Sequence, residues 1–460
     1  MSLSIVIMAA GKGTRMKSDR PKVLHTLAGT PLLGHVLQAC AALQADRVVV
    51  VTGHGADEVE HYVRQAAPQA VCVRQMPQHG TGHAVQQTVP LLPDEGAVLV
   101  LNGDVPLIRE STARSLVQAC DSRHLALLTI ELDDPSGYGR IVRQGTAVRG
   151  IVEHKDASPE QRAIREVYTG VMAAPARWLK QAVMDLRNDN VQGEYYLTDV
   201  VAQAASQGLT INSAAAPSED EVLGVNSPAQ LADLERRHQR AQAQALMESG
   251  VRLADPARLD IRGRLVCGRD VEIDVNCIFE GEVHLADGVR IGSHCVIRQA
   301  RILEGAVIHP FTHIDGDAQG VTVGARSLVG PYARLRPGAQ LAEDVHIGNF
   351  VEVKNSSLAA GTKANHLAYL GDATVGERVN YGAGSITANY DGANKHRTVI
   401  EADVHVGSNC VLVAPVTVGA GATIGAGSTV AKDAPAGQLT VVRAKQISLA
   451  GWKRPTKTPR

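Results

Sequence analysis

The chain has 460 residues, more than one ordinary hydrophobic core holds, so two or three domains are expected. Hydrophobic residues make up 44% and charged residues 20% of the chain, a composition that excludes a disordered protein. The formal net charge of −1 argues against binding to nucleic acid or to an anionic membrane through bulk charge.

Cysteine usage and hydropathy predict where the protein works. Its 7 cysteines include no CxxC pair, which disfavours both a disulfide framework and a zinc site. No apolar run approaches the length of about 18 residues that a transmembrane helix needs. The first apolar run is not preceded by the basic segment of a signal peptide. We therefore expect a reduced, soluble, cytoplasmic protein.

Residues 1–226 alternate short apolar runs with helical stretches. The apolar runs are residues 3–9, 47–52, 97–101 and 125–130, and helices are expected over 31–43 and 82–92. Such alternation predicts a doubly wound α/β domain, in which ligands bind beyond the carboxyl ends of the strands. This rule directs attention to the loops at 11–15 and 102–104.

Residues 227–250 predict a linker helix. Ser227 is a suitable N-cap, Pro228 suits the first helical position, and Gly250 supplies a stop. The stretch between them is rich in Ala, Gln, Leu, Glu and Arg, which is typical of a solvated connector.

Beyond residue 250 an aliphatic side chain recurs at every sixth position. Of 21 positions in series that begin at Ile261, Val323 and Ile400, 18 are Ile, Leu or Val, and the first series runs on through Leu303 to His309. This period predicts a parallel β-helix with one inward side chain per hexapeptide. Its small corner residues explain why 25 of the 44 glycines lie here. Three units per coil would make a triangular prism, and loops are expected to leave it at 310–322, 354–374 and 387–399.

The first candidate site is the glycine-rich loop 9–15. Its backbone amides suit a phosphate group, although it matches neither the P-loop nor the dinucleotide fingerprint and is also compatible with a plain turn. Arg15 and Lys22 add two cations, which suits a triphosphate whose pyrophosphate must leave. Asp104, after another apolar run, is either a Mg²⁺ ligand or a turn aspartate.

Polar residues also gather where the hexapeptide pattern breaks. His366 is one of 17 histidines, most of which are expected at the surface or in packing roles. Its neighbours Lys354 and Tyr369 single it out as a candidate general base, a task that suits an imidazole. Residues 384–396 are expected to form a loop insertion between coils.

The order of these motifs resembles that of the sugar-1-phosphate nucleotidyltransferases. The resemblance rests on residues 9–16 with Pro21-Lys22, and on residues 80–84, 103–106, 137–141, 151–156 and 193–199. Together with the hexapeptide region, the chain is similar throughout to the bacterial bifunctional N-acetylglucosamine-1-phosphate uridyltransferase/glucosamine-1-phosphate N-acetyltransferase family. This implies a uridyltransferase domain over 1–226 and a left-handed β-helix with N-acetyltransferase activity over 251–460.

The resemblance implies two reactions that make UDP-N-acetylglucosamine for peptidoglycan and lipopolysaccharide synthesis. Acetyl-CoA would first acetylate glucosamine 1-phosphate in the C-terminal domain. UTP would then react with N-acetylglucosamine 1-phosphate in the N-terminal domain and release pyrophosphate. Mg²⁺ is the implied cofactor, UTP and acetyl-CoA are co-substrates, and the implied assembly is a homotrimer without nucleic-acid or membrane partners.

The resemblance also assigns the site residues, with Arg15 and Lys22 acting on the phosphates and His366 as the base. Binding of UTP or UDP-N-acetylglucosamine is implied for Met8, Ala9, Ala10, Gly11, Lys22, Gln75, Gly80, Thr81, Asn102, Gly103, Asp104, Gly139, Glu153, Tyr168 and Asn226. Mg²⁺ is assigned to Asp104 and Asn226. Glucosamine 1-phosphate is assigned to Arg336, Lys354, Tyr369 and Asn380, with Glu352 beside the base. Acetyl-CoA is assigned to Ala383, Asn389, Tyr390, Ser408, Ala426 and Arg443.

One position departs from the family pattern. The resembling enzymes usually carry Asn-Thr-Gly where this chain has Tyr168-Thr169-Gly170. The tyrosine would either replace the amide contact through its hydroxyl or pack over the sugar ring. Two other functions stay open: a nucleotidyltransferase whose β-helix is structural or regulatory, and a sugar-nucleotide-binding sensor.

Overall fold

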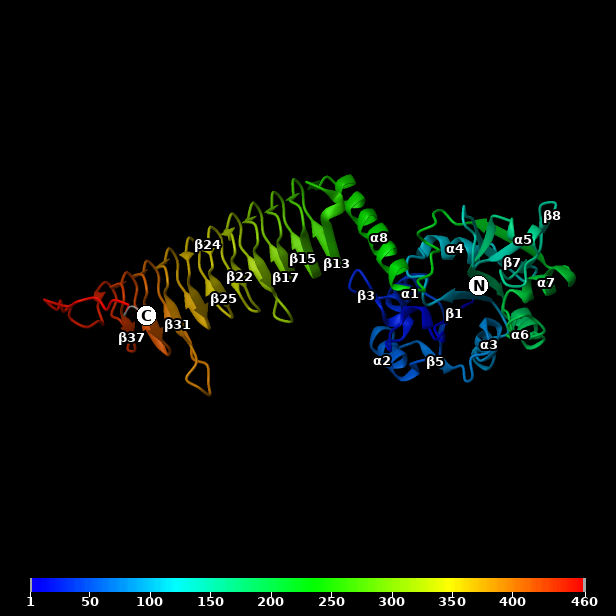
Figure 1. The fold of residues 1–460 in the computed structure, drawn as a ribbon, viewed down its shortest axis with the longest axis horizontal. Coiled ribbons are helices and arrows are strands. Elements are labelled where there is room, and N and C mark those ends of the chain that lie inside the picture. The colour runs from blue at the N-terminus through cyan, green and yellow to red at the C-terminus, as the bar shows by residue number, and fades with distance from the viewer. Residues whose placement is uncertain (1, 458–460) are drawn as a thin grey trace. The chain divides into compact units, whose positions relative to one another are not determined.

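The computed structural model describes residues 2–457, and the chain divides into two compact units between His238 and Gln239 (Figure 1). The division falls inside α8 (Pro228–Glu248), the helix expected as a linker. No helix in the described part of the chain is long and apolar enough to cross a membrane.

Unit 1 is built on a mixed sheet whose strand order is β11-β7-β10-β6-β1-β4-β5. Its strands are β1 (Leu3–Met8), β4 (Arg47–Thr52), β5 (Val71–Arg74), β6 (Ala97–Asn102), β7 (His124–Glu131), β10 (Glu166–Pro175) and β11 (Thr210–Ala215). The four apolar runs of the sequence are all strands, but β10 runs antiparallel between β6 and β7. β8 (Gly139–Gln144) and β9 (Ala147–Val152) form an antiparallel pair beside β10.

Helices cover both faces of this sheet. One hydrophobic core contains residues of α1 (Leu32–Leu43), α2 (Ala56–Ala66) and α4 (Glu110–Gln118), and the other contains residues of α3 (Thr81–Gln86), α6 (Ala176–Met184) and α7 (Asp199–Ser206). The helix expected over 82–92 is shorter, because Pro90 lacks the N–H that a continuous helix needs. The chain instead forms a 3₁₀ turn over Val89–Leu91.

The small elements of unit 1 lie mostly in its loops. They are the 3₁₀ turns η1 (Thr14–Met16) and η2 (Lys22–Leu24), the paired strands β2 (Thr26–Leu27) and β3 (Thr30–Pro31), and the short helix α5 (Pro159–Arg162). η1 ends the glycine-rich loop and η2 follows it, and the two turns carry the cations Arg15 and Lys22.

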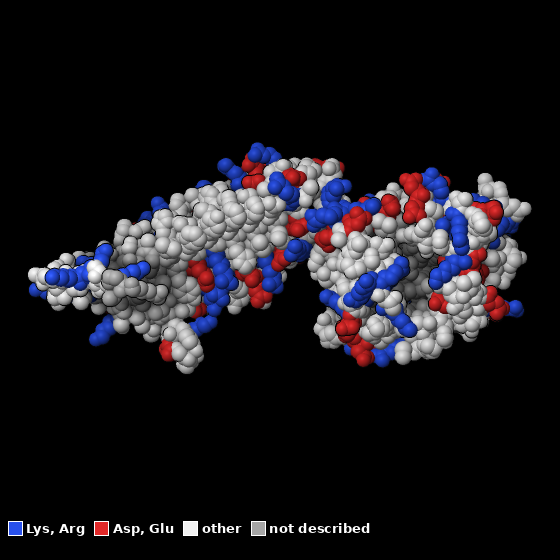
Figure 2. Space-filling model, viewed as in Figure 1, with Lys and Arg blue, Asp and Glu red and all other residues white. Residues whose placement is uncertain are grey.

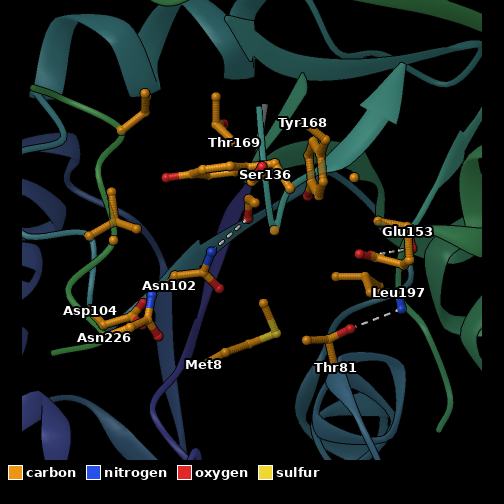
Figure 3. A pocket seen from close by; sticks show the side chains of 18 of the residues that line it. Met8, Thr81, Asn102, Asp104, Ser136, Glu153, Tyr168, Thr169, Leu197 and Asn226 are labelled. Carbon is orange, nitrogen blue, oxygen red and sulfur yellow. Dashed lines mark hydrogen bonds between the residues drawn. The ribbon is translucent and has the colours of Figure 1, made fainter. Parts of the chain in front are cut away.

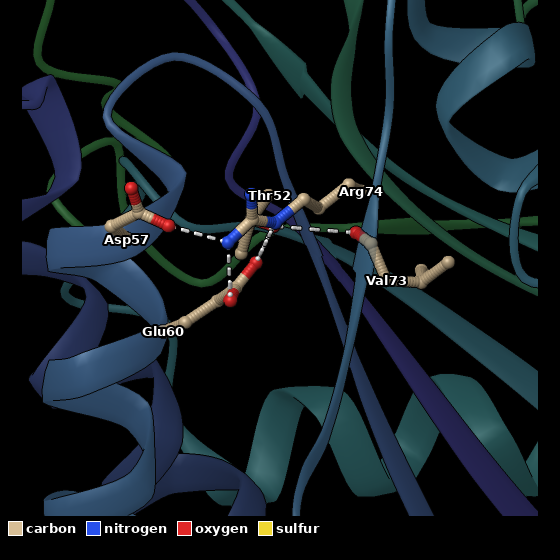
Figure 4. A network of polar contacts seen from close by, with 5 residues as sticks. All are labelled: Thr52, Asp57, Glu60, Val73 and Arg74. Atoms are coloured by element: carbon tan, nitrogen blue, oxygen red, sulfur yellow. Dashed lines mark hydrogen bonds and ion pairs between the residues drawn. The ribbon is translucent and has the colours of Figure 1, made fainter.

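An arginine ties α2 to the edge of the sheet (Figure 4). Arg74, the last residue of β5, donates to Glu60 at 2.7 and 2.9 Å and also contacts Asp57. Thr52 donates to the same Glu60 carboxylate at 3.0 Å. The Arg74 guanidinium lowers the pKa of Glu60, so the anion that accepts these bonds is favoured.

Unit 2 is a parallel β-helix with three faces, as the hexapeptide period predicts (Figure 1). The first face contains β12 (Arg252–Leu253), β14 (Glu272–Ile273), β16 (Arg290–Ile291), β18 (Val307–Ile308), β21 (Leu328–Val329), β24 (His346–Asn349), β27 (Lys363–His366), β30 (Asn380–Tyr381), β33 (His405–Val406), β36 (Thr423–Ile424) and β38 (Leu439–Thr440). A 3₁₀ turn, η4 (Pro256–Arg258), follows β12.

The second and third faces are joined in the early coils by long strands that turn the corner. These strands are β13 (Leu259–Cys267), β15 (Cys277–Leu285) and β17 (Val296–Ile302). The second face continues as β19 (His313–Asp315), β22 (Arg334–Leu335), β25 (Glu352–Lys354), β28 (Tyr369–Gly371), β31 (Ile386–Ala388), β34 (Val411–Val413) and β37 (Thr429–Val430). The third continues as β20 (Val321–Val323), β23 (Gln340–Leu341), β26 (Ser357–Leu358), β29 (Ala373–Val375), β32 (Thr398–Ile400) and β35 (Val416–Val418).

The inward series slips by one residue in the third coil. Between β15 and β17 the register shifts, and the side-chain carbonyl of Gln299 accepts the Glu282 N–H at 2.7 Å. Ile302 consequently points inward and Leu303 is 41% exposed. The prediction that Leu303 and the half-buried His309 belong to the inward series is therefore wrong.

The loops that leave the prism are shorter than expected. Residues 354–374 stay in the wall and contribute strands β26 to β29, so the loop prediction there is wrong. The segment expected at 310–322 leaves the wall only over residues 316–320, because β19 and β20 flank it. The third break does form a protruding loop, over residues 389–397. The insertion expected over 384–396 therefore begins later than predicted, because β31 keeps residues 386–388 in the wall.

One edge of the prism carries a ladder of stacked rings. His294, Phe311, Tyr332 and Phe350 stack on consecutive coils, with centroid distances of 4.8, 5.0 and 5.4 Å. Each has a positive φ angle at the corner, as does Leu367 on the next coil. Phe311, Tyr332, Phe350 and Leu367 are 46–61% exposed. We call His294, Phe311, Tyr332, Phe350 and Leu367 together the aromatic edge.

The first coil is capped by residues of α8 that belong to the same unit. Ala243 is fully buried in the core of the prism. The Gln239 carboxamide accepts the Ile261 N–H and donates to the Ile261 carbonyl, both at 2.8 Å. This side chain therefore supplies the hydrogen bonds that a neighbouring strand would make.

Candidate functional sites in the two units

The two predicted loops of unit 1 meet because their strands are neighbours. β1 and β6 are parallel, and Met8 at the end of β1 lies opposite Asn102 at the end of β6. The Gly103 N–H donates to the Met8 carbonyl at 2.9 Å. The glycine-rich loop and Asp104 therefore lie at the same carboxyl edge of the sheet, as expected of a ligand site in this class of fold.

The first cavity at this edge has a volume of about 430 Å³. Ten residues assigned to the nucleotide line it: Met8, Ala9, Ala10, Gly11, Lys22, Gln75, Gly80, Thr81, Asn102 and Asp104. We call it the glycine-loop cavity. A side chain at Gly11 would meet no protein atom within 4 Å, so the loop keeps this space open for a ligand. Figure 2 shows Lys and Arg side chains beside a hollow in this unit.

A second cavity, of about 280 Å³, adjoins the first (Figure 3). We call it the tyrosine cavity. It shares Met8, Thr81, Asn102 and Asp104 with the glycine-loop cavity. Its other predicted residues are Arg15, Gly139, Glu153, Tyr168 and Asn226. Of the residues assigned to unit 1, only Gly103 lines neither of these two cavities, and it packs against Met8 and Ala9 instead.

Three residues from distant parts of unit 1 meet at the junction of the cavities. The Lys22 ammonium forms an ion pair with Asp104 and donates to Asn226 Oδ1 at 3.2 Å. The Lys22 and Asp104 side chains are only 13% and 19% exposed. The two residues assigned to Mg²⁺ therefore direct oxygens at one cationic position.

Gln75 shapes the turn that holds Gly80. Its carboxamide donates to the Gly80 carbonyl at 2.8 Å and contacts His83 Nδ1 at 3.2 Å. The Thr81 hydroxyl, next in the chain, accepts the Leu197 N–H at 3.0 Å (Figure 3). These bonds fix one wall of the glycine-loop cavity before a ligand enters.

Glu153 is the buried acid of the tyrosine cavity. The Thr198 hydroxyl donates to its Oε1 at 2.9 Å. Burial raises the pKa of Glu153, and the nearby carboxylates of Asp199, Asp156 and Glu194 act in the same direction. The protonated form of its carboxyl group, which can donate a hydrogen bond, is therefore favoured more than in an exposed glutamate.

Tyr168 lies in the wall of the tyrosine cavity and is 7% exposed. Within residues 2–457 its hydroxyl has no hydrogen-bond partner, and burial raises its pKa. The following Thr169-Gly170 lets β10 approach β6: a Cβ at Gly170 would lie 2.1 Å from Asn102 Nδ2. The position supports both predicted roles of Tyr168, a hydroxyl contact and ring packing.

Several lining residues were not assigned from the sequence. In the tyrosine cavity they include Ser136, Tyr138, Thr169, Thr198 and Gln230, and in the glycine-loop cavity Lys12, Gln78 and Glu194. Lys12, Tyr138 and Glu194 lie inside quoted motifs, so the signal was present. Gln230, on the first turn of α8, had none, because its position depends on where that helix begins.

In unit 2 four of the six predicted acetyl-CoA residues, Ala383, Ser408, Ala426 and Arg443, form a column along one edge of the first face. Backbone hydrogen bonds join His366 to Gly384, Ala383 to Asn409, and Ser408 to Gly427 on successive coils. These contacts place His366, Ala383, Ser408 and Ala426 one above another. Arg443 ends the column, because its guanidinium donates to the Ala426 carbonyl at 2.8 Å.

His366 is oriented by a residue that the sequence did not single out. Its Nδ1 lies 2.8 Å from Oδ1 of Asn349, which stands opposite it on the preceding coil. A carbonyl oxygen can only accept a hydrogen bond, so Nδ1 is the nitrogen that carries the proton in the neutral ring. Nε2 then keeps its lone pair and can accept a proton. The separation of 17 residues, about one coil, was the available signal.

The predicted phosphate ligands lie on the second face, beyond the Leu367 corner. Arg336 donates to Glu352 at 2.7 Å, and Glu352 stands beside Tyr369. The neighbouring Lys395 ammonium, burial and Arg336 lower the pKa of Lys354. Three cations thus crowd together, and an anionic ligand would relieve their repulsion.

One chain does not bring all the predicted acetyltransferase residues together. Asn380 lies on the first face, one coil beyond Lys363, and is exposed. Asn389 is buried and donates to Asp372, so its amide anchors the 389–397 loop. Tyr390 on that loop is 62% exposed. Neither loop residue joins the column of Ala383 and Ser408.

Comparison with known proteins matches both units. The model of the MobA-like NTP transferase domain matches residues 5–186, and that of the bacterial transferase hexapeptide (six repeats) matches residues 397–432. The chain is 71% identical to the bifunctional protein GlmU of Methylibium petroleiphilum over 99% of both chains. It is 66% identical to the bifunctional protein GlmU of Paracidovorax citrulli over 100% of this chain and 99% of the relative. With such identity over its full length, the chain belongs to the GlmU family of bifunctional uridyltransferase/acetyltransferase enzymes that make UDP-N-acetylglucosamine.

Proposed function

We propose that unit 1 transfers UMP from UTP to N-acetylglucosamine 1-phosphate, and that unit 2 first makes this sugar phosphate from glucosamine 1-phosphate and acetyl-CoA. The observation that carries the first half is the junction of two cavities at Asp104. The glycine-loop cavity takes the nucleotide and the tyrosine cavity takes the sugar. Their reacting phosphates then meet between Lys22, which lines the glycine-loop cavity, and Arg15, which lines the tyrosine cavity.

Uridylyl transfer needs alignment and charge neutralisation more than a protein base. The second pKa of a sugar phosphate is about 6, so its oxygen is already anionic at neutral pH. This oxygen attacks the α-phosphorus of UTP, and the bond from that phosphorus to the bridging oxygen breaks as pyrophosphate leaves. Arg15 and Lys22 neutralise the charge that develops on the phosphates.

The residues at the junction fit Mg²⁺. Asp104 and Asn226 turn a carboxylate and an amide oxygen toward a single cation, the Lys22 ammonium. Hard oxygens of this kind suit Mg²⁺, which commonly takes one or two protein ligands and completes its shell with phosphates and water. The described residues hold no cluster of three or more His, Cys, Asp or Glu that would compete as a metal site. When bound, Mg²⁺ would neutralise phosphate charge.

Acetyl transfer is assigned to the edge around His366. Nε2 of His366 takes a proton from the amino group of glucosamine 1-phosphate, and the amine attacks the thioester carbonyl of acetyl-CoA. The carbon–sulfur bond then breaks and CoA leaves as the thiol. Arg336 and Lys354 bind the sugar phosphate, with Tyr369 and Asn380 at the sugar. Ser408 stabilises the oxyanion.

Acetyl-CoA takes the column below His366. Ala383 and Ala426 leave room for the pantetheine chain, and Arg443 binds the CoA phosphates. Asn389 and Tyr390 lie away from this column in one chain, so they complete it best from a neighbouring copy. This arrangement supports a homotrimer in which each site lies between subunits. Its substrates, UTP and acetyl-CoA, place the enzyme in the cytoplasm.

Paired substitutions test this assignment with both half-reactions measured on each purified variant. We expect Asp104→Ala to lower uridylyl transfer about 100-fold or more, an effect typical of lost charge stabilisation, and to leave acetyl transfer nearly intact. His366→Ala should lower acetyl transfer by about 100-fold or more and spare uridylyl transfer. Equal loss of both activities in a folded variant contradicts the assignment.

The single-activity alternative predicts a different outcome. If the β-helix were only structural, the wild-type protein would release no thiol from acetyl-CoA with glucosamine 1-phosphate. The contact of Asn349 with His366 and the crowding of Arg336, Lys354 and Lys395 favour catalysis, because a passive wall needs neither. Pyrophosphate release from UTP separates both enzymes from a sensor that only binds sugar nucleotides.

A further inference from the structure

The position between Asp104 and Asn226 is already filled by a cation of the chain itself. Lys22 pairs with the Asp104 carboxylate and donates to Asn226 Oδ1 at 3.2 Å. These are the two oxygens that the proposed function assigns to Mg²⁺. Since the ammonium and a divalent ion seek the same oxygens and repel each other, the two cannot occupy the position together.

The Lys22 side chain is anchored at its base and free to move at its tip. It begins η2, and its Cβ lies 2.7 Å from the position that a Cβ on Gly13 would take. Gly13 has a φ angle of 58°, a left-handed backbone conformation that favours glycine. A side chain at this position would also collide with Cβ of Lys22. The flexible four-carbon stem of the Lys22 side chain allows its ammonium to move to another position. Lys22 also lines the glycine-loop cavity.

Lys22 therefore has two anionic partners within one side-chain movement. In the free protein its partner is the Asp104 carboxylate. A triphosphate in the glycine-loop cavity offers phosphate oxygens with a larger total charge. When the ammonium turns to these oxygens, Asp104 and Asn226 lose their cation and become available together.

We infer that Lys22 closes the Asp104–Asn226 site to divalent cations until a nucleoside triphosphate draws the ammonium away. This inference rests on the proposed function, because it uses the same two oxygens as metal ligands. Its thermodynamic consequence is positive coupling: nucleotide and metal each raise the affinity of the protein for the other. The free protein then binds divalent cations weakly.

The test is direct binding of Mn²⁺, as a spectroscopic substitute for Mg²⁺, to the full-length protein without nucleotide. Electron paramagnetic resonance measures free Mn²⁺ during a titration. We expect Lys22→Met, which keeps the stem and removes the charge, to bind Mn²⁺ about tenfold more tightly than the wild type. This gain in binding should accompany a loss of uridylyl transfer.

Two control variants isolate the charge at this position. Lys22→Arg keeps a cation and should bind Mn²⁺ as weakly as the wild type. Lys12→Met removes another cation that lines the glycine-loop cavity, and it should leave the Mn²⁺ affinity of the nucleotide-free protein unchanged. Circular dichroism and thermal unfolding establish that each variant is folded.

The double variant Lys22→Met with Asp104→Asn separates failure of the inference from failure of the proposed function. Loss of the tight Mn²⁺ site in the double variant supports both. Equal Mn²⁺ affinity of Lys22→Met and the wild type overturns the exchange. Tight binding that survives Asp104→Asn shows that Asp104 is not the ligand, and this result overturns the metal assignment itself.

Discussion

At the scale of single residues, Asn349 decides which nitrogen of His366 is free. We expect Asn349→Leu to mix the two imidazole tautomers and to lower the kcat of acetyl transfer about tenfold, with little change in KM. Asn349→Asp keeps an acceptor at the same place and should restore most of the rate. Nitrogen NMR of the imidazole reports the tautomer directly. An unchanged tautomer in a slow leucine variant would contradict the positioning role.

Glu153 makes the stability of unit 1 depend on pH. Burial raises its pKa from the ordinary value of 4.5, so the native state binds its proton more tightly than the unfolded chain does. Stability is therefore lost as pH rises from the unfolded pKa through the native one, and the cost is fully present above that window. Glu153→Gln removes this cost.

We accordingly expect Glu153→Gln to raise the unfolding midpoint of unit 1 at pH 8 and to leave it unchanged at pH 4. The fluorescence of Trp178 on α6 follows this unit. Glu95→Gln, at an exposed carboxylate, serves as the control and should show no such difference. A glutamine variant that is less stable at pH 8 than the wild type would refute the expectation.

At the scale of elements, Gln299 supplies a hydrogen-bond acceptor where the wall of the prism lacks one residue. Its side-chain carbonyl accepts the Glu282 N–H at 2.7 Å where the strand register shifts. Gln299→Ala removes this acceptor and should cost about 1 kcal/mol, which lowers the melting temperature of unit 2 by about 2–4 °C. Gln340→Ala, at the exposed position of β23, is the matched control and should change little. Equal effects of the two variants in calorimetry would exclude this role of Gln299.

The same elements show what the sequence could predict. A period of six is a property of side-chain burial, so it revealed the prism and its inward positions. The first series holds as far as Ile297, and the series that begin at Val323 and Ile400 are buried throughout. It could not reveal the slip at Gln299. The side chain of Gln299 replaces a backbone hydrogen-bond acceptor there, and this replacement changes no feature of the sequence pattern. Residues 354–374 looked like a loop because polar residues replace the usual aliphatic pattern while the backbone stays in the wall.

The site of unit 1 was predictable for a different reason. Loops at the carboxyl ends of neighbouring parallel strands must meet, so the glycine-rich loop and Asp104 could be paired before the structure. The contact of Lys22 with Asn226 could not, since it joins residues 204 positions apart through a turn and a helix entry. Asn349 was missed because its amide acts on the next coil and not on its own neighbours.

At the scale of the whole molecule, the aromatic edge favours self-association. Exposed stacked rings on consecutive coils form an apolar strip that is costly to leave in water, and the strip runs to Leu367, which follows His366 directly. We expect Tyr332→Glu to reduce the mass in solution from that of the proposed trimer to that of a monomer. Acetyl transfer should fall with it, whereas uridylyl transfer should persist.

Light scattering with both assays tests this expectation. Leu303→Glu places the same charge on an exposed apolar residue away from the aromatic edge, so it should leave the mass and both activities unchanged. A Tyr332→Glu protein that keeps the wild-type mass would remove the aromatic edge from the interface. A monomer that still acetylates at the wild-type rate would show that one chain completes its own site.

The Gln239 cap also bears on the order in which the protein is made. The capped coil leaves the ribosome before all other coils, because it is the first coil in the sequence. Its cap on α8 has then already been synthesised. At a synthesis rate of about 5–20 residues per second, each further coil emerges within about one to four seconds. Each new strand can then pair with the strand of the preceding coil, and the wall lengthens in the direction of translation. The last described strand, β38, pairs with β36, which is synthesised before it.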